Sequence, residues 1–133
     1  MQYFVDTAFF LALVLERDEF HEAAVRWQEE AKGGFVTTNY VLVETVNSLS
    51  HHKLRATAAA LVSHVRGASE FEVIPASEAM MDAGLALYRS RPDKDWSLTD
   101  CISFVVMRKC GLAEALTSDR HFEQAGFKAL LRK

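Results

Sequence analysis

Cysteine and proline are scarce in this chain, with two of each among 133 residues, and glycine occurs only six times. This composition excludes a disulfide-based scaffold, a collagen-like repeat and a low-complexity chain rich in proline and glycine. The chain also lacks an apolar run long enough to span a membrane and a basic segment at the N-terminus. Neither a membrane-spanning helix nor a signal peptide is therefore expected.

The residues that are present fit an ordinary soluble globular protein. Apolar residues make up 50% of the chain and charged residues 25%, and a chain of this length can bury roughly two-thirds of its unfolded surface. A single domain over residues 1–133 is expected.

Cys101 and Cys110 would lie about 13 Å apart along a helix, too far for a disulfide, so we expect free thiols and a cytoplasmic location.

An excess of positive charge is also missing. The chain has 18 acidic and 15 basic side chains, and its formal net charge is −3. Proteins that capture nucleic acid by long-range attraction usually carry a basic surface. Taken alone, the total charge argues against a nucleic-acid partner.

Short apolar segments alternate with helical patterns along the chain. We expect strands at residues 2–5, 35–37, 71–74, 113–116 and 127–131. Helices are expected at residues 8–15, 39–50, 56–66, 77–88, 97–109 and 120–124, with an acidic helix within residues 16–30. The alternation predicts an α/β fold, a three-layer α/β/α sandwich with a central parallel sheet of about five strands. In such sheets ligands bind beyond the carboxyl ends of the strands.

Two aspartates follow predicted strands. Asp6 comes directly after Val5, and Asp119 follows the strand-like segment that begins at Ala113. Both are therefore expected at the edge of the sheet where ligands bind. Aspartate is also a good N-cap, so each residue could simply cap the helix that follows it.

Two further acids lie in apolar helix starts. Glu44 interrupts the run from Tyr40 to Val46, which is apolar enough to predict burial on every side. A buried carboxylate is costly unless it is paired with a cation or bound to a metal, so the alternatives are an arginine partner or a side chain tilted to the surface. Asp100 follows Ser97 by three residues, which fits a capping box, and it begins another apolar helix.

These acids can converge on one edge of the sheet: Asp6, Glu44, Asp100 and Asp119. Four carboxylates so close together would repel one another strongly without a cation. Oxygen ligands with no accompanying set of cysteines or histidines favour Mg²⁺ or Mn²⁺, and such a site suits hydrolysis of a phosphodiester. Thr7, Thr117 and Ser118 are expected to orient the carboxylates from behind.

The segments around these acids resemble the four acidic motifs of PIN domains. They are Val5-Asp6-Thr7, Thr38 to Glu44, Ser97-Leu98-Thr99-Asp100-Cys101 and Thr117 to Phe122. Their order and spacing follow the family over essentially the whole chain, and the third and fourth motifs are the most specific. The closest likeness is to the small single-domain prokaryotic group that includes the VapC toxins.

The resemblance implies a metal-dependent endoribonuclease that cleaves single-stranded RNA and leaves 5′-phosphate and 3′-hydroxyl ends. It implies that the four acids are the catalytic residues and ligate Mg²⁺ or Mn²⁺. It also implies a homodimer and a cognate VapB antitoxin, because both are typical of VapC proteins. Asp95, just before the third motif, is a candidate accessory acid, with a solvated loop residue as the alternative.

Two other function classes share parts of this pattern. A stand-alone PIN nuclease without an antitoxin would carry the same motifs. A receiver-like signalling module also places aspartates and Mg²⁺ at strand ends, but it needs a pair of acids after the first strand, where Asp6 stands alone. Its middle strand should also end in an acid, and Val73-Ile74-Pro75 has none. The nuclease is therefore the preferred prediction.

Basic residues flank two of the motifs. Lys53 and Arg55 follow Glu44, and Arg89 and Arg91 precede the third motif, so these four are candidates for contact with RNA phosphates. Solvated helix surfaces are the alternative for them. His121, two residues past Asp119, is expected on the surface of its helix, with a place at the mouth of the cleft as the alternative.

The position of the acids changes the meaning of the net charge. With the four candidate ligands set aside, 14 acidic and 15 basic side chains remain, and residues 16–30 alone contain six acids and two arginines. The negative total thus combines a metal site with one acidic segment. A bound divalent cation would reverse the sign of the charge at the cleft.

Overall fold

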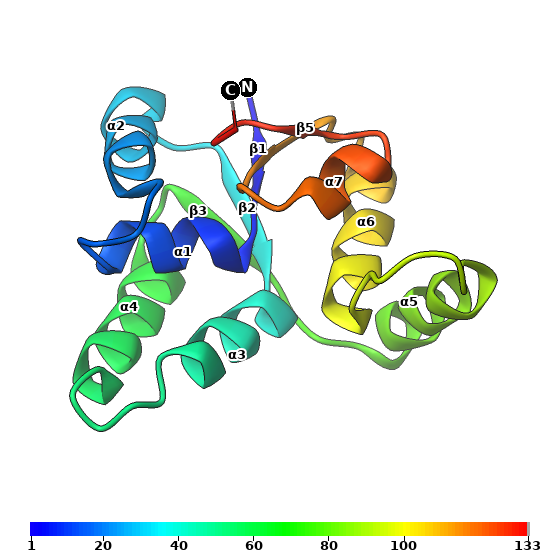
Figure 1. The fold of residues 1–133 in the computed structure, drawn as a ribbon, viewed down its shortest axis with the longest axis horizontal. Helices are drawn as coiled ribbons and strands as arrows, with labels where there is room; N and C mark the ends of the chain where they lie inside the picture. Colours follow the sequence, from blue (N-terminus) through cyan, green and yellow to red (C-terminus); the bar gives the residue numbers. More distant parts are fainter. Residues whose placement is uncertain (133) are drawn as a thin grey trace.

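The computed structural model describes residues 1–132, and the last residue of the expected domain, Lys133, lies outside them. The strands are β1 (Tyr3–Val5), β2 (Phe35–Thr38), β3 (Phe71–Ile74), β4 (Glu114–Leu116) and β5 (Lys128–Ala129). The helices are α1 (Thr7–Val14), α2 (His21–Ala31), α3 (Asn39–Ser48), α4 (Arg55–Gly67), α5 (Glu78–Ser90), α6 (Leu98–Cys110) and α7 (Arg120–Gln124) (Figure 1).

The strands form one parallel sheet in the order β3-β2-β1-β4-β5. From the central β1 the chain moves outward through β2 to β3, then crosses back to β4 and moves outward in the other direction to β5. The winding therefore reverses between β1 and β4, and this is where α/β sheets bind their ligands. Val5 pairs with Leu116, so the next residues, Asp6 and Thr117, lie side by side at this point.

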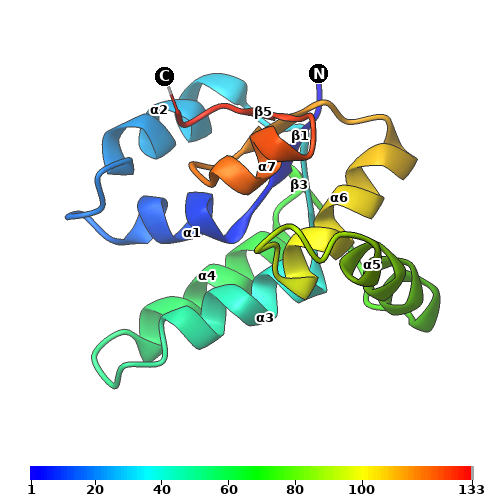
Figure 2. The same ribbon diagram turned by 45° about the vertical axis from the view of Figure 1, so that its right-hand side comes forward.

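Helices cover both faces of the sheet, as the two ribbon views show (Figures 1 and 2). One side carries α1, α2 and α4, the other carries α6 and α7, and α5 packs on the outside of α6. Each face has its own aromatic cluster. One contains Phe9, Phe10, Phe35 and Phe71, and the other contains Phe4, Trp96, Phe104, Phe122 and Phe127. The predicted three-layer α/β/α sandwich is confirmed.

Local side-chain signals mark the helix ends. Thr38 accepts a hydrogen bond from the Val41 amide, and Ser97 and Asp100 form the predicted capping box. α6 ends at Gly111, whose φ of 69° is left-handed and favours glycine. The six helices outside the acidic segment agree with the predicted bounds to within two residues. The last strand is shorter than predicted, because the chain turns directly after Ala129.

The expectation that the start of α3 is buried on every side is wrong. Val43 is 59% exposed and Glu44 is partly exposed, whereas Val41 and Leu42 are buried. α3 packs against α1, α4 and α6, and this leaves one of its faces open. Glu44 is therefore not fully desolvated.

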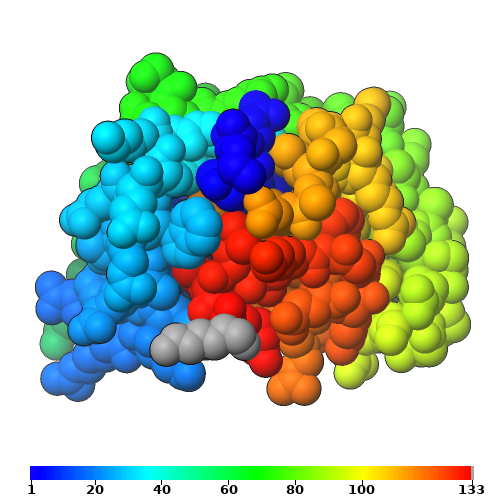
Figure 3. All heavy atoms as spheres, turned by 90° about the horizontal axis from the view of Figure 1, so that it is seen from above, coloured from blue at the N-terminus to red at the C-terminus, as the bar shows by residue number. Residues whose placement is uncertain are grey.

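Both chain ends lie at the edge where the strands begin, opposite the carboxyl ends of the strands (Figure 1). Figure 3 views this edge, with the N-terminal residues in dark blue between the cyan segment near β2 and the orange segment near β4.

Cys101 is buried and Cys110 exposed, and both are free thiols. Within residues 1–132, no helix combines the length and apolar character that crossing a membrane requires.

The packing of α5 on α6 leads to a prediction about Gly84. A Cβ atom at this position would overlap Cγ1 of Ile102 in α6. Gly84→Ala should lower the free energy of unfolding by about 1–3 kcal/mol, although alanine favours helix more than glycine does. Urea unfolding followed by circular dichroism measures the change.

Gly67→Ala is the matched control, because a Cβ there has no atom within 4 Å. It should leave the stability unchanged or raise it slightly. If both variants were as stable as the unsubstituted chain, the close contact of α5 with α6 would be disproved.

Candidate functional site

Four acids lie where helices start at the carboxyl-end edge of the sheet. Asp6 occupies the N-cap position of α1 and Asp119 the N-cap position of α7. Asp100 lies in the first turn of α6, and Glu44 lies in the second turn of α3. Four segments that are distant in sequence therefore each supply one carboxylate to the same region.

Asp6 is buried, with 3% of its surface exposed, and its side chain makes no capping hydrogen bond to α1. It accepts a hydrogen bond from the hydroxyl of Thr117, with 2.8 Å between Oγ1 and Oδ2. The same hydroxyl oxygen accepts a bond of 3.0 Å from the Asp119 amide. Capping therefore does not explain Asp6, and Thr117 links the two strand-end acids.

Asp100 and Asp119 do cap their helices. Oδ2 of Asp100 accepts from the Ser97 amide at 3.1 Å, and Oδ1 of Asp119 accepts from the His121 amide at 2.8 Å. These bonds leave further acceptor positions on both carboxylates. Capping fixes where the two side chains point, and it is compatible with a second role for each.

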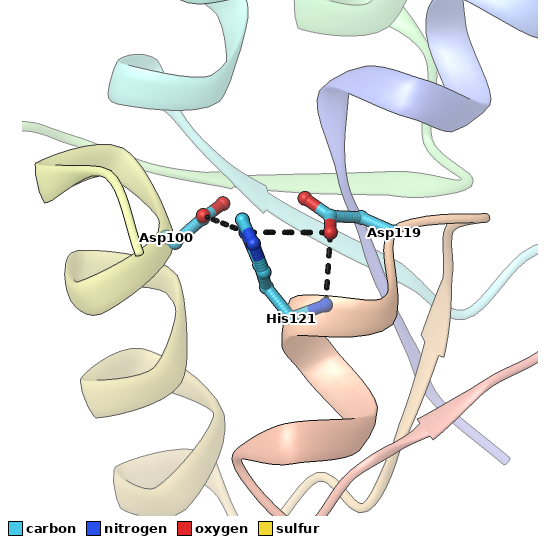
Figure 4. Close-up of side chains that lie close together, drawn as sticks. All are labelled: Asp100, Asp119 and His121. Atoms are coloured by element: carbon cyan, nitrogen blue, oxygen red, sulfur yellow. Dashed lines mark hydrogen bonds and ion pairs between the residues drawn. The ribbon is translucent and has the colours of Figure 1, made fainter. Parts of the chain in front are cut away.

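His121 lies between these two carboxylates rather than on the outer surface of α7, so its predicted position is wrong (Figure 4). Its Nδ1 is 3.1 Å from Oδ2 of Asp100 and 3.4 Å from Oδ1 of Asp119, and its side chain is 27% exposed. Phe122, the next residue, is fully buried and sets the rotation of α7. The sequence signal for this position is that His121 follows Asp119 by two residues and lies in the first turn of the same helix.

Burial and the charges of neighbouring acids raise the pKa of Asp6 and of Asp100. Burial raises the pKa of Asp6 to about 7, the hydrogen bond from Thr117 opposes this rise, and the negative charges of Asp100 and Glu44 add to it. Burial also raises the pKa of Asp100, as does the charge of Asp119, while the Ser97 amide and His121 lower it. Asp6 and Asp100 therefore lie close enough to other acids for the charged form of each to be destabilised.

Among residues 1–132, no lysine or arginine forms an ion pair with any of the four acids. The arginine partner considered for Glu44 is thus not seen. Ligand atoms of Asp100, Asp119 and His121 lie within 4.8 Å of one another. Two carboxylates, one of them buried, with an imidazole and no lysine or arginine ion pair form a donor set that fits a divalent metal ion.

The residues expected to orient the acids, and the candidate accessory acid Asp95, make the following contacts. The Thr7 hydroxyl donates to the Val41 carbonyl at 3.5 Å and so connects α1 with α3. The Ser118 carbonyl accepts a bond of 3.1 Å from Arg132. Asp95 is exposed in the loop before α6.

The candidate RNA-contacting residues lie on two surfaces. Lys53 lies in the turn between α3 and α4, and Arg55 begins α4 and donates to the Ser50 carbonyl at 3.3 Å. Arg89 is exposed in the last turn of α5. Arg91 is held by Asp93 at 3.0 Å and lies over the ring of Trp96, 5.1 Å from its centroid.

Comparisons with known proteins agree with this geometry. The family described as the PIN domain matches residues 3–128. The 23S rRNA-specific endonuclease VapC20 of Mycobacterium tuberculosis, from two strains, is 31% identical over 127 residues, which are 93% of this chain and 94% of the relative. A crystal structure of Mycobacterium tuberculosis VapC20, described as a sarcin-ricin loop cleaving toxin, has a TM-score of 0.87 and 28% identity, covering 95% of this chain and 96% of that one.

The raised pKa of Asp6 predicts how stability depends on pH without metal. The folded chain holds the Asp6 proton up to about pH 7, whereas the unfolded chain releases it near 3.8. The free energy of unfolding should therefore fall as the pH rises between these values, by at most about 1.4 kcal/mol per pH unit. Urea unfolding at pH 5 and pH 8 in the presence of EDTA measures the fall.

Asp6→Asn should reduce the difference in stability between pH 5 and pH 8. Asp93→Asn is the control, because the ion pair with Arg91 holds the pKa of Asp93 at about 2, so this residue stays charged across the range. An Asp6→Asn protein with the full pH dependence of the unsubstituted chain would refute the assignment to Asp6.

Proposed function

The chain belongs to the PIN-domain family, and on that premise we propose that it is a metal-dependent endoribonuclease toxin in which four acids hold the ion: Asp6, Glu44, Asp100 and Asp119. The expectation of a PIN-domain nuclease related to the VapC toxins is confirmed by the family match and the relatives. The observation that carries the proposed site is the gathering of four acids where the sheet changes direction, with Asp6 and Asp100 buried and no lysine or arginine paired with any of them among residues 1–132.

The side chains around the acids hold them in place before substrate arrives. Thr117 fixes the spacing between Asp6 and Asp119 because its hydroxyl group contacts both residues. The capping box fixes Asp100 at the start of a helix whose next three residues are buried. When held by these acids, Mg²⁺ or Mn²⁺ would supply an activated water and positive charge for cleavage of the phosphodiester. The prearranged carboxylates need little reorganisation to hold such an ion, which favours catalysis.

We propose an unpaired segment of a structured RNA as substrate. The relative VapC20 is specific for 23S rRNA and cleaves the sarcin-ricin loop, so this loop is the first RNA to test. Lys53, Arg55 and Arg89 are exposed and suit contact with phosphates on either side of the cleaved bond. Arg91 is the least available of the four basic residues, because Asp93 and Trp96 already engage it.

We propose a cognate VapB-type antitoxin and a second copy of the chain as protein partners, and the cytoplasm as the location. An open hollow of about 350 Å³ between α3 and α4 supports a protein partner, since its lining includes Leu42, Val43, Val46 and Val62. Val43 is unusually exposed for a large apolar side chain. The free thiols agree with a reducing compartment.

RNA cleavage tests the catalytic proposal. Purified protein with Mg²⁺ or Mn²⁺ should cleave a synthetic sarcin-ricin loop, and EDTA should abolish the reaction. Asp6→Asn and Asp100→Asn should each reduce the rate by about 100-fold or more, because each removes a ligand charge. Asp93→Asn is the control and should retain full activity, since its carboxylate is exposed and paired with Arg91. Cleavage that persists in EDTA and in both site variants would disprove the metal-dependent mechanism.

Expression in a bacterial host tests the toxin role against that of a stand-alone nuclease. The unsubstituted chain should arrest growth, and co-expression of the protein encoded by the adjacent upstream gene should relieve the arrest. Asp100→Asn should permit growth at an equal protein level, as measured by immunoblot. Normal growth with active, expressed enzyme would favour the stand-alone nuclease.

A further inference from the structure

We propose that His121 is a nitrogen ligand of the metal centre, and that this centre therefore favours first-row transition ions over Mg²⁺. The inference rests on the proposed function, because it concerns the same group of acids. It changes the chemical class of the site from an all-oxygen donor set to a mixed nitrogen–oxygen set.

The spacing of the donor atoms supports this assignment. Nδ1 of His121 is 3.1 Å from a carboxylate oxygen of Asp100 and 3.4 Å from one of Asp119. Adjacent donors around an octahedral ion with bonds of about 2.1 Å lie about 3.0 Å apart. The imidazole nitrogen thus has the spacing of a neighbouring ligand to both carboxylate oxygens, and its ring points between them (Figure 4).

The surroundings of His121 hold the ring in this position. Its own amide donates to Asp119 at 2.8 Å, so the residue is tied to one of the acids through its backbone. Phe122 packs against Phe4 and Phe104 in the core, with ring centroids 6.3 and 4.9 Å away. Because α7 is anchored on both sides of His121, the imidazole cannot leave the two acids by a simple rotation of the helix.

The chemistry of the donor predicts a change in metal preference. Carboxylates suit Mg²⁺ and Mn²⁺, whereas imidazole suits ions such as Fe²⁺, Ni²⁺ and Zn²⁺. Co²⁺ lies between Fe²⁺ and Ni²⁺ in the order of affinities, so an imidazole beside carboxylates should strengthen the binding of Co²⁺ more than that of Mg²⁺. His121 is the histidine that the structure places here: His51 and His52 stack on each other at the α3–α4 turn, and His21 contacts the Ala12 carbonyl.

Pulsed electron paramagnetic resonance of the Mn²⁺-loaded protein gives a direct test. A ¹⁴N coupling to the bound Mn²⁺ is expected in the unsubstituted protein and in His64→Gln, which alters an exposed histidine of α4. The coupling should be absent in His121→Phe, which keeps a ring but no donor. No nitrogen coupling in the unsubstituted protein, or a coupling that persists in His121→Phe, would overturn the assignment.

Calorimetric titration separates a ligand from a residue that only hydrogen-bonds to Asp100. His121→Asn keeps an amide that can donate to Asp100 but removes the ring nitrogen. If His121 is a ligand, His121→Asn should bind Co²⁺ at least about tenfold more weakly than the unsubstituted protein does. The affinity for Mg²⁺ should change less. Full rescue of Co²⁺ affinity by asparagine would mean a hydrogen-bonding role and would overturn the proposal.

The same measurements distinguish this inference from the proposed function. Mn²⁺ binding that is lost in Asp100→Asn but unchanged in His121→Phe would overturn the His121 assignment and leave the nuclease centre standing. A protein that shows the ¹⁴N coupling but leaves RNA intact would support the ligand assignment and overturn the proposed function.

Discussion

The desolvation of Asp6 at the end of the central strand is the constraint on which the site depends. A carboxylate that is 3% exposed is unfavourable in its charged form, and the charges of Asp100 and Glu44 increase this cost. The Thr117 hydroxyl offsets only part of it. A cation bound among these acids would offset the remainder, which is why burial here favours metal binding over a purely structural role.

The core keeps these like charges together against their repulsion. One aromatic cluster packs α1 against β2 and β3, and the other packs α6 and α7 against β1. Because the strands are parallel and aligned, anchoring the helices on the two faces also fixes the four helix starts at one edge. The burial of many apolar side chains thus compensates for a site that is locally unfavourable.

The electrostatic character of the molecule follows from position rather than from the total of −3. Acids are concentrated at the carboxyl-end edge of the sheet and in residues 16–30, which lead into α2 and include most of it, whereas Lys53, Arg55 and Arg89 lie exposed on other elements. An RNA chain could contact these cations through its phosphates while a metal ion neutralises the acids at the cleft. A negatively charged protein can therefore act on a negatively charged substrate.

The sequence by itself determined the bounds of the helices other than α2 to within two residues, the capping of α6 by Ser97 and the order of the four acidic motifs, because these signals act within a few residues. Only the tertiary structure decided that Thr117 bonds Asp6 across 111 residues, that His121 lies between Asp100 and Asp119, and that Val43 is exposed. Those features depend on strand order and on the rotation of α3 and α7 as they pack. Apolar periodicity in the sequence shows that a helix has a buried face. Which polar residues of different helices come together depends on how the helices pack against one another.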